Sequence, residues 1–239
     1  MKLIVFPHAG GFANFYEFMK NYPFEHVDEV YLYEYPGRGK KYYMPMGKSV
    51  RQLARTAALE LEHVIGAETY ALFGHSMGAF VAFEASVYLQ KMLGRKAELL
   101  IVSGQQQPYN YTGVGMDFHK ESTVIDYLKD MGGTDELIFS NQEARSFFLP
   151  MIQNDLIMAE EYTVSSTKQE KRCKNIAVLY GREDAELTEE NTAGWKAVGE
   201  NYIGAHIFRG GHFYMNEEHN KLNSYLDKLF KKCALESVA

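Results

Sequence analysis

Short apolar runs alternate with longer amphipathic segments along most of the 239-residue chain. Glycine, proline or charged residues bound each short run, which is typical of strands buried in a parallel sheet. We expect strands at Leu3–Phe6, Glu29–Tyr35, Thr69–Phe73, Glu98–Val102, Asn175–Tyr180 and Ala205–Phe208. Apolar residues at helical spacing, or helical composition, predict helices at Asn14–Met19, Ser49–Ile65, residues 77–93, Thr188–Val198 and Glu217–Lys232. Such alternation predicts an α/β fold with a mainly parallel, doubly wound sheet.

The alternation stops between Gln105 and Arg172. After a loop with glycine and proline, three helical segments rich in Phe, Leu, Ile and Met follow: Ser122–Met131, Asn141–Phe148 and Met151–Tyr162. This many apolar residues indicate a surface that covers either the sheet edge or an acyl chain. We therefore interpret the insertion as a helical lid over the sheet edge rather than a solvent-facing decoration. We therefore expect residues 1–239 to form one domain, with a lid insertion at about 105–172.

The pentapeptide Gly74-His75-Ser76-Met77-Gly78 lies between an apolar run and a segment of helical composition. A G-x-S-x-G pattern between a strand and a helix is typical of the nucleophile elbow of an α/β-hydrolase. The turn is too tight for side chains at its two glycines, and it holds the serine hydroxyl above the carboxyl edge of the sheet. We therefore predict an α/β-hydrolase fold with Ser76 as the catalytic nucleophile.

A serine nucleophile needs a general base, and the base needs a group that orients it. In α/β-hydrolases the acid and then the histidine follow the serine along the chain. His212 follows the last predicted strand in a Gly-Gly-His loop, so we assign it as the base. Asp184 follows the preceding strand at the usual separation and is the assigned acid, with Glu183 and Glu186 as alternatives.

Two further histidines, His8 and His75, are expected at the same edge but are not assigned to the triad. His8 precedes the serine, and the turn directs His75 away from it. The oxyanion of an acyl-transfer intermediate needs backbone N–H donors, one just after the nucleophile and one from an earlier strand–helix loop. We assign these donors to Met77 and Ala9, with Gly10 as the reserve.

The composition of the chain limits the partners and cellular locations that the protein is expected to have. The chain has 25 Lys and Arg against 31 Asp and Glu, a formal net charge of −6, and this argues against a nucleic-acid partner. The N-terminus lacks the pattern of a signal peptide, and no apolar run approaches membrane-spanning length. Cys173 and Cys233 make a weak case for a disulfide, so we expect reduced thiols. We expect a cytoplasmic monomer without a metal or cofactor.

Eight blocks form a longer pattern around the elbow. They are Phe6-Pro7-His8-Ala9-Gly10-Gly11, Pro36-Gly37-Arg38, Phe73-Gly74-His75-Ser76-Met77-Gly78, Ser103-Gly104 with Pro108, Gly132-Gly133-Thr134, Leu149-Pro150 with Asp155 and Tyr162, Gly181 with Asp184 and Trp195, and Gly210-Gly211-His212-Phe213. Together they resemble the type II thioesterases that accompany nonribosomal peptide and polyketide synthases. The chain departs from that family at Phe12, where a small serine is usual, and at Gln153, where an arginine is usual. These departures concern substrate fit and lid packing.

The resemblance implies that the protein hydrolyses acyl groups from the phosphopantetheine thiol of carrier domains and so removes stalled or misprimed units. It implies Ser76, Asp184 and His212 as the triad and acyl or peptidyl carrier protein domains as partners. The phosphopantetheine then belongs to the substrate and is not a cofactor. Two surfaces are candidates for carrier recognition: the lid, and the basic run Arg38-Gly39-Lys40-Lys41.

Three other functions remain open from the sequence. A carboxylesterase or lipase would act on an oxygen ester with the same fold and triad. A hydrolase-like binding protein would have no activity, although such proteins usually lose a triad residue. An acyltransferase would pass the acyl group to another thiol or alcohol rather than to water.

Overall fold

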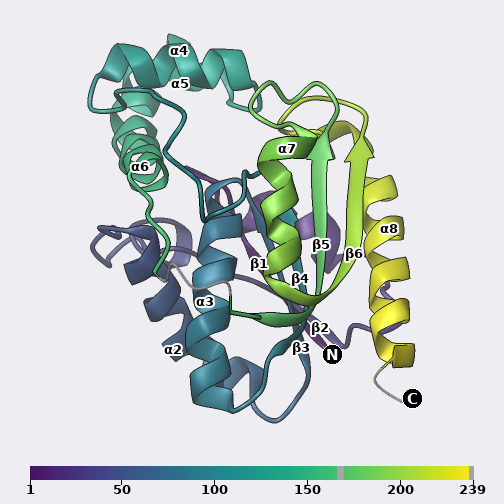
Figure 1. Cartoon of the computed structure of the whole chain (residues 1–239). Helices are drawn as coiled ribbons and strands as arrows, with labels where there is room; N and C mark the ends of the chain where they lie inside the picture. Colours follow the sequence, from purple (N-terminus) through teal and green to yellow (C-terminus); the bar gives the residue numbers. More distant parts are fainter. Residues whose placement is uncertain (166–169, 237–239) are drawn as a thin grey trace.

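The computed structural model describes residues 1–165 and 170–236. Its six-stranded sheet has the order β2-β1-β3-β4-β5-β6, and all neighbouring strands are parallel. The strands are β1 (Lys2–Phe6), β2 (Glu29–Leu32), β3 (Tyr70–His75), β4 (Ala97–Ser103), β5 (Cys173–Gly181) and β6 (Gly199–Phe208). Every residue of the central strands β3 and β4 is buried, because helices cover both faces of the sheet. This is the predicted α/β-hydrolase architecture (Figure 1).

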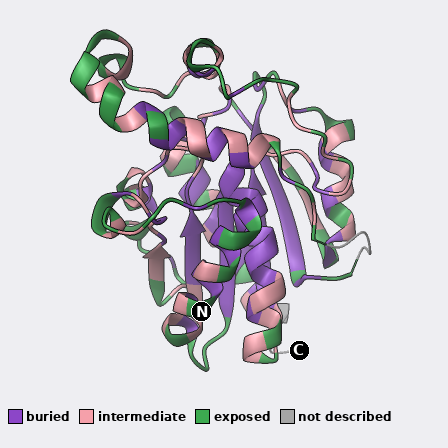
Figure 2. Ribbon diagram, turned by 90° about the vertical axis from the view of Figure 1, so that its left-hand side faces the viewer, coloured by how far each residue is buried: buried purple, intermediate pink, exposed green. Residues whose placement is uncertain are grey.

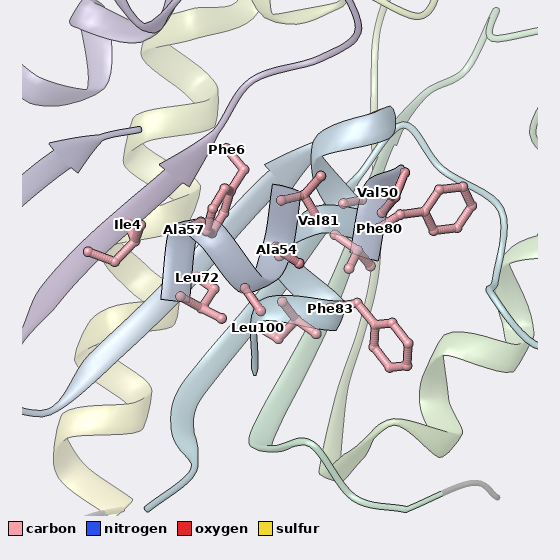
Figure 3. Close-up of a cluster of buried hydrophobic side chains, with 14 of the residues drawn as sticks. Ile4, Phe6, Val50, Ala54, Ala57, Leu72, Phe80, Val81, Phe83 and Leu100 are labelled. Carbon is pink, nitrogen blue, oxygen red and sulfur yellow. The ribbon is translucent and has the colours of Figure 1, made fainter. Parts of the chain in front are cut away.

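The helices are α1 (Glu17–Lys20), α2 (Val50–Ile65), α3 (Met77–Leu93), α4 (Glu121–Met131), α5 (Glu136–Ser140), α6 (Gln142–Glu160), α7 (Glu189–Thr192) and α8 (Met215–Glu236), with 3-10 turns η1 (Ala13–Tyr16), η2 (Gly39–Lys41) and η3 (Ala193–Ala197). One core lies between the sheet and α2, α3 and η3, where Leu72 and Leu100 meet Ala54 and Val81 (Figure 3). A second core lies on the opposite face, under α8 and the η1–α1 segment. Figure 2 shows the strands as a buried layer between helices with exposed outer faces.

Local chemistry explains why α2 and α3 form where they do. The Ser49 hydroxyl caps α2 by accepting the Gln52 N–H at 3.2 Å, as its N-cap position predicts. The helix buries one stripe, including Leu53 and Leu61, and ends at Gly66. α3 begins directly after the serine elbow and ends at Gly94, which adopts the left-handed conformation expected of a residue that terminates a helix.

Several expectations about individual elements need correction, among them the start of β6, which is Gly199 rather than Ala205. β2 ends at Leu32 rather than Tyr35, because the chain then leaves the ladder and buries its tyrosines in the core. The segment from Thr188 is one turn of α-helix followed by the turn η3. α5, capped by Asp135, was not predicted.

A further correction concerns Pro150, which does not divide two helices but lies inside the continuous helix α6. A proline in a helix interior removes one backbone hydrogen bond. A stripe of buried side chains from Leu149 to Leu156 packs against α4 and its preceding loop and holds the helix together across this position.

The insertion between β4 and β5 places α4, α5 and α6 at the carboxyl end of the sheet (Figure 1). It has its own apolar cluster, in which Val124, Leu149 and Ile152 are buried. Ala9 and Phe12, from the loop after β1, pack against this cluster. Residues 166–169 of the predicted lid and residues 237–239 lie outside the described residues.

Candidate active site

Three predicted residues follow strands that end at one edge of the sheet. Ser76 follows β3, Asp184 follows β5 and His212 follows β6. The register aligns the ends of these strands: His75 of β3 pairs with Ser103 of β4, and Ser103 pairs with Leu179 of β5. Parallel strands therefore bring side chains that are distant in sequence to one site.

The serine elbow has the strained backbone that its sequence predicts. Ser76 has φ +54° and ψ −126°, and it is the one non-glycine residue with positive φ in the described chain. Such a conformation costs roughly 1–3 kcal/mol, and surrounding structure must enforce it. A Cβ on Gly74 would overlap the Gly78 carbonyl, and a Cβ on Gly78 would overlap the Phe6 carbonyl. Both glycines are therefore required by close backbone approach, as predicted.

The structure joins Asp184 to His212. Asp184 Oδ2 lies 2.8 Å from His212 Nδ1, and both residues are buried. Asp184 Oδ1 accepts the Glu186 backbone N–H at 3.1 Å, which fixes the plane of the carboxylate. The Glu183 side chain instead accepts the Gly210 N–H. Of the three acids weighed from the sequence, Asp184 is thus the one seen bonded to the histidine ring.

Glu186 lies beside this pair and faces the insertion. Burial raises the pKa of its carboxyl above the ordinary value, whereas His212 and a hydrogen bond from Tyr127 of α4 act in the opposite direction. The loop that carries Asp184 therefore contacts the first helix of the insertion. Position along the sequence gave no signal for this contact.

Two neutral histidines pack behind His212. The His75 ring centroid lies 4.8 Å from that of His212, and the His8 ring lies 6.0 Å from that of His75. Burial lowers the pKa of His8 from 6.5 to about 3 and lowers that of His75 well below 6.5. The triad prediction set His75 aside, yet its ring forms a wall of the pocket that holds the His212 imidazole.

A hydrogen-bonded chain and a glycine hold the His75 ring in place. His75 Nδ1 lies 3.0 Å from Ser103 Oγ, which lies 2.8 Å from the Tyr214 hydroxyl. Gly104 has φ +62°, and a Cβ there would lie 2.5 Å from His75 Cε1 and 3.4 Å from His212 Cε1. The two packed rings therefore need a residue without a side chain at this position.

The loop after β1 is held by α6. The Gly10 N–H donates to Asp155 Oδ2 at 2.8 Å, so this reserve oxyanion donor is already bonded. Asp155 also forms a buried ion pair with Arg38, whose guanidinium donates to the Gly11 carbonyl at 3.1 Å. The hypothesis that Arg38 belongs to an exposed basic run is therefore wrong, because only 2% of the residue is exposed.

The assigned oxyanion donors are Met77 and Ala9. Met77 is the first residue of α3, where backbone N–H groups lack intrahelical acceptors. Ala9 precedes Gly10 in the loop clamped by Asp155. Ile152 of α6 lies against Gly10, so the insertion covers this loop directly.

The insertion also contacts the loop that carries the histidine. A Cβ on Gly133, between α4 and α5, would overlap the ring of Phe213. Together with the Tyr127 and Ile152 contacts, this places the insertion against the loops after β1, β5 and β6.

In residues 1–165 and 170–236 no group of three or more His, Cys, Asp or Glu side chains could hold a metal ion. Within the same residues, no helix is long and apolar enough to span a membrane.

A buried Asp–His pair beside a strained serine turn, at the carboxyl edge of an all-parallel sheet, defines the α/β-hydrolase class. Within that class, the family model described as "Thioesterase domain" matches residues 1–233. The chain belongs to this thioesterase family, as its sequence blocks indicated.

The chain is also similar to individual proteins over most of its length. The chain is 29% identical over 237 residues to the thioesterase PikA5 of Streptomyces venezuelae, covering 96% of this chain and 81% of that protein. It is 27% identical over 235 residues to the linear gramicidin dehydrogenase LgrE of Brevibacillus parabrevis, covering 94% and 86%. Among solved structures, the type II thioesterase BorB from the borrelidin biosynthetic cluster matches with a TM-score of 0.82 and 28% identity, covering 96% and 92%.

Proposed function

We propose that this thioesterase hydrolyses acyl groups from the phosphopantetheine thiol of carrier proteins and so edits a nonribosomal peptide or polyketide synthase, as in antibiotic biosynthesis. The observation that carries the proposal is the 2.8 Å contact between Asp184 and His212, at the edge where the Ser76 turn emerges, in a chain of the thioesterase family. The type II thioesterase BorB, from a biosynthetic cluster, supports the carrier-bound substrate.

The proposed mechanism proceeds through an acyl-enzyme. Ser76 Oγ attacks the thioester carbonyl while His212 Nε2 takes the hydroxyl proton, which then passes to the departing thiol. Asp184 holds the Nδ1–H of His212 and stabilises the imidazolium. The N–H groups of Met77 and Ala9 donate to the oxyanion. Water, activated by His212, then releases the acid and restores the serine.

The insertion at about 105–172 is proposed to act as a lid in this single domain. Its apolar cluster packs on Ala9 and Phe12, next to the proposed oxyanion loop, and offers a surface for an acyl chain. Hydrogen exchange tests this role. Amides of α4 and α5 should exchange faster than those of β3 and β4, and they should slow when a long-chain fluorophosphonate acylates the enzyme. Unchanged protection after acylation would argue against a lid.

Other activities for a member of this family have less support. LgrE is named a dehydrogenase, but the present sequence contains no G-x-G-x-x-G fingerprint for a dinucleotide. An oxygen esterase would share every feature of the site. We further propose a cytoplasmic monomer that works without a bound cofactor, which light scattering and metal analysis of the purified protein can test.

A competition between substrates tests the proposed function. One acyl group is presented on a carrier protein, on N-acetylcysteamine and as a p-nitrophenyl ester, and release is followed by mass spectrometry. We expect the highest kcat/KM on the carrier protein, with no turnover by Ser76→Ala. A higher kcat/KM on the oxygen ester, or full activity in Ser76→Ala, would overturn the proposal.

A further inference from the structure

Positive charge is concentrated in one stretch of this acidic chain. Six cationic residues and no acidic residue lie between Tyr35 and Leu59, although the whole chain carries a net charge of −6. They are Arg38, Lys40, Lys41, Lys48, Arg51 and Arg55. Two of them have partners in the fold: Arg38 is paired with Asp155, and Lys41 with Glu60. The other four are exposed and form no ion pair with any described residue.

Two aromatic side chains protrude from the same stretch. Tyr42 is 75% exposed and Tyr43 is 74% exposed, with ring centroids 5.9 Å apart. Tyrosine offers apolar contact area and a hydroxyl at a small conformational cost, and it is enriched at protein interfaces. We define the docking patch as Lys40, Tyr42, Tyr43, Lys48 and Arg51.

The docking patch borders the proposed lid and the loop after β1. The Asn154 side chain of α6 donates to the Gly47 carbonyl at 3.1 Å, directly before Lys48. At the other end of the segment, Arg38 holds the Gly11 carbonyl. Figure 1 shows the segment, in dark blue, below α6 and beside the start of α2. A partner seated here would lie at the rim of the carboxyl edge, where Ser76 is located.

We propose that the docking patch binds an acidic surface of the carrier protein and thereby directs its phosphopantetheine arm towards Ser76. The inference rests on the proposed function and adds the surface that recognises the partner. Carrier proteins as a class are acidic, so the net charge of this enzyme opposes the encounter and only a local cationic surface can favour it. Charges at the rim of an interface chiefly raise the association rate, whereas the tyrosines supply contact area.

Charge distinguishes this surface from the neighbouring groove. The groove of about 620 Å³ along the outer side of β2 carries mixed charge: Glu17, Asp28, Glu29 and Glu34 line it together with Lys20, Lys40 and Lys41. An acidic partner would meet both signs of charge there, whereas no acidic residue lies between Tyr35 and Leu59, so the patch beside α6 is the more complementary site.

The test compares two charge reversals of equal size. Lys48→Glu with Arg51→Glu alters the docking patch, and Lys228→Glu with Lys232→Glu alters exposed residues of α8, on the opposite face of the sheet. Steady-state kinetics use one acyl group on an acidic carrier protein and on N-acetylcysteamine. We expect the patch variant to lose about tenfold or more in kcat/KM on the carrier, equivalent to about 1.4 kcal/mol, and to keep its activity on the small thioester. The α8 variant should match the wild type on both.

Salt and a second variant make the result decisive. Rates on the carrier should fall as ionic strength rises, and the fall should be smaller in the patch variant, because screening acts on exposed charges. The double variant Tyr42→Ser with Tyr43→Ser should raise KM for the acyl-carrier and leave KM for the N-acetylcysteamine thioester unchanged. Equal losses in the patch and α8 variants, or a patch variant with wild-type kinetics on the carrier, would overturn the docking patch. Failure of the wild type to act on any acyl-carrier would instead refute the proposed function.

Discussion

Asp155 of α6 and Arg38, which follows β2, form a two-pronged ion pair inside the protein. The Asp155 oxygens lie 2.7 and 2.8 Å from the two terminal nitrogens of Arg38, and both side chains are at most 1% exposed. Asp155 also accepts the Gly10 backbone N–H, and Arg38 donates to the Gly11 carbonyl. The pair therefore couples the insertion to the loop that we assign to the oxyanion hole. Because these two charges hold the loop after β1, its orientation should be disturbed when either charge is lost.

Removing the Asp155 carboxylate should therefore destabilise the protein and disturb catalysis. Asp155→Ala leaves the buried Arg38 charge without a partner, and we expect a loss of about 3–5 kcal/mol in the free energy of unfolding. Urea denaturation measures this loss. The double variant Arg38→Met with Asp155→Leu should recover much of the stability but not kcat, because the Gly10 amide is no longer held. Recovery of both would show that the pair has no positioning role.

The Asp–His contact should govern turnover rather than folding. In Asp184→Asn the side chain can no longer favour the active tautomer of His212, and we expect kcat to fall by about 10⁴ with little change in melting temperature. Glu183→Gln provides the matched control, because its side chain bonds a backbone N–H. A fluorophosphonate should label Ser76 alone. If Glu183→Gln were inactive and Asp184→Asn active, the acid would be wrongly assigned.

A methyl group at Gly104 should displace the rings of His75 and His212, which pack against each other. Gly104→Ala places a Cβ against His75 and close to His212, so we expect kcat to fall by more than KM rises. Gly115→Ala is the control, since Gly115 also has positive φ but no atom lies within 4 Å of the new Cβ. The control separates crowding from backbone strain. Similar kinetics for the two variants would mean that the packing behind His212 does not position it.

Stability should decline as the pH falls below neutrality. The folded state keeps His8 neutral down to about pH 3, whereas its unfolded form gains a proton below about pH 6.5. The unfolded state therefore binds more protons across this window, and each such histidine destabilises the fold by up to about 1.4 kcal/mol per pH unit. His75, whose pKa is also lowered, adds to the slope in the same direction.

Urea unfolding at pH 7, 6 and 5 measures this dependence. His8→Gln should make the curve shallower, because the side chain no longer titrates, whereas a substitution of the exposed His63 serves as the control. If His8→Gln kept the full slope, protonation of His8 would not contribute to acid sensitivity.

The amino-acid sequence alone was sufficient to predict the sheet, the elbow and the contact between Asp184 and His212. These features depend on local rules: apolar runs form buried strands, and parallel strands place their following loops at one edge. Gly74 marked the tight turn because its close approach is to Gly78 within the same pentapeptide, whereas the close approach of Gly78 is to the Phe6 carbonyl at the end of β1. Sequence spacing also favoured Asp184 over Glu183 and Glu186, although it did not show where each carboxylate points.

Only the tertiary structure determined contacts between residues that are far apart along the chain. Arg38 reads as part of an exposed basic run until Asp155, 117 residues later, packs against it. His75 faces His212 because β3 and the loop after β6 converge, and no spacing within either segment shows that contact. Pro150 reads as a helix terminator, yet burial of the surrounding apolar stripe outweighs one lost backbone hydrogen bond. Local propensity therefore set the elements, whereas burial and charge pairing across the fold set the surroundings of the site.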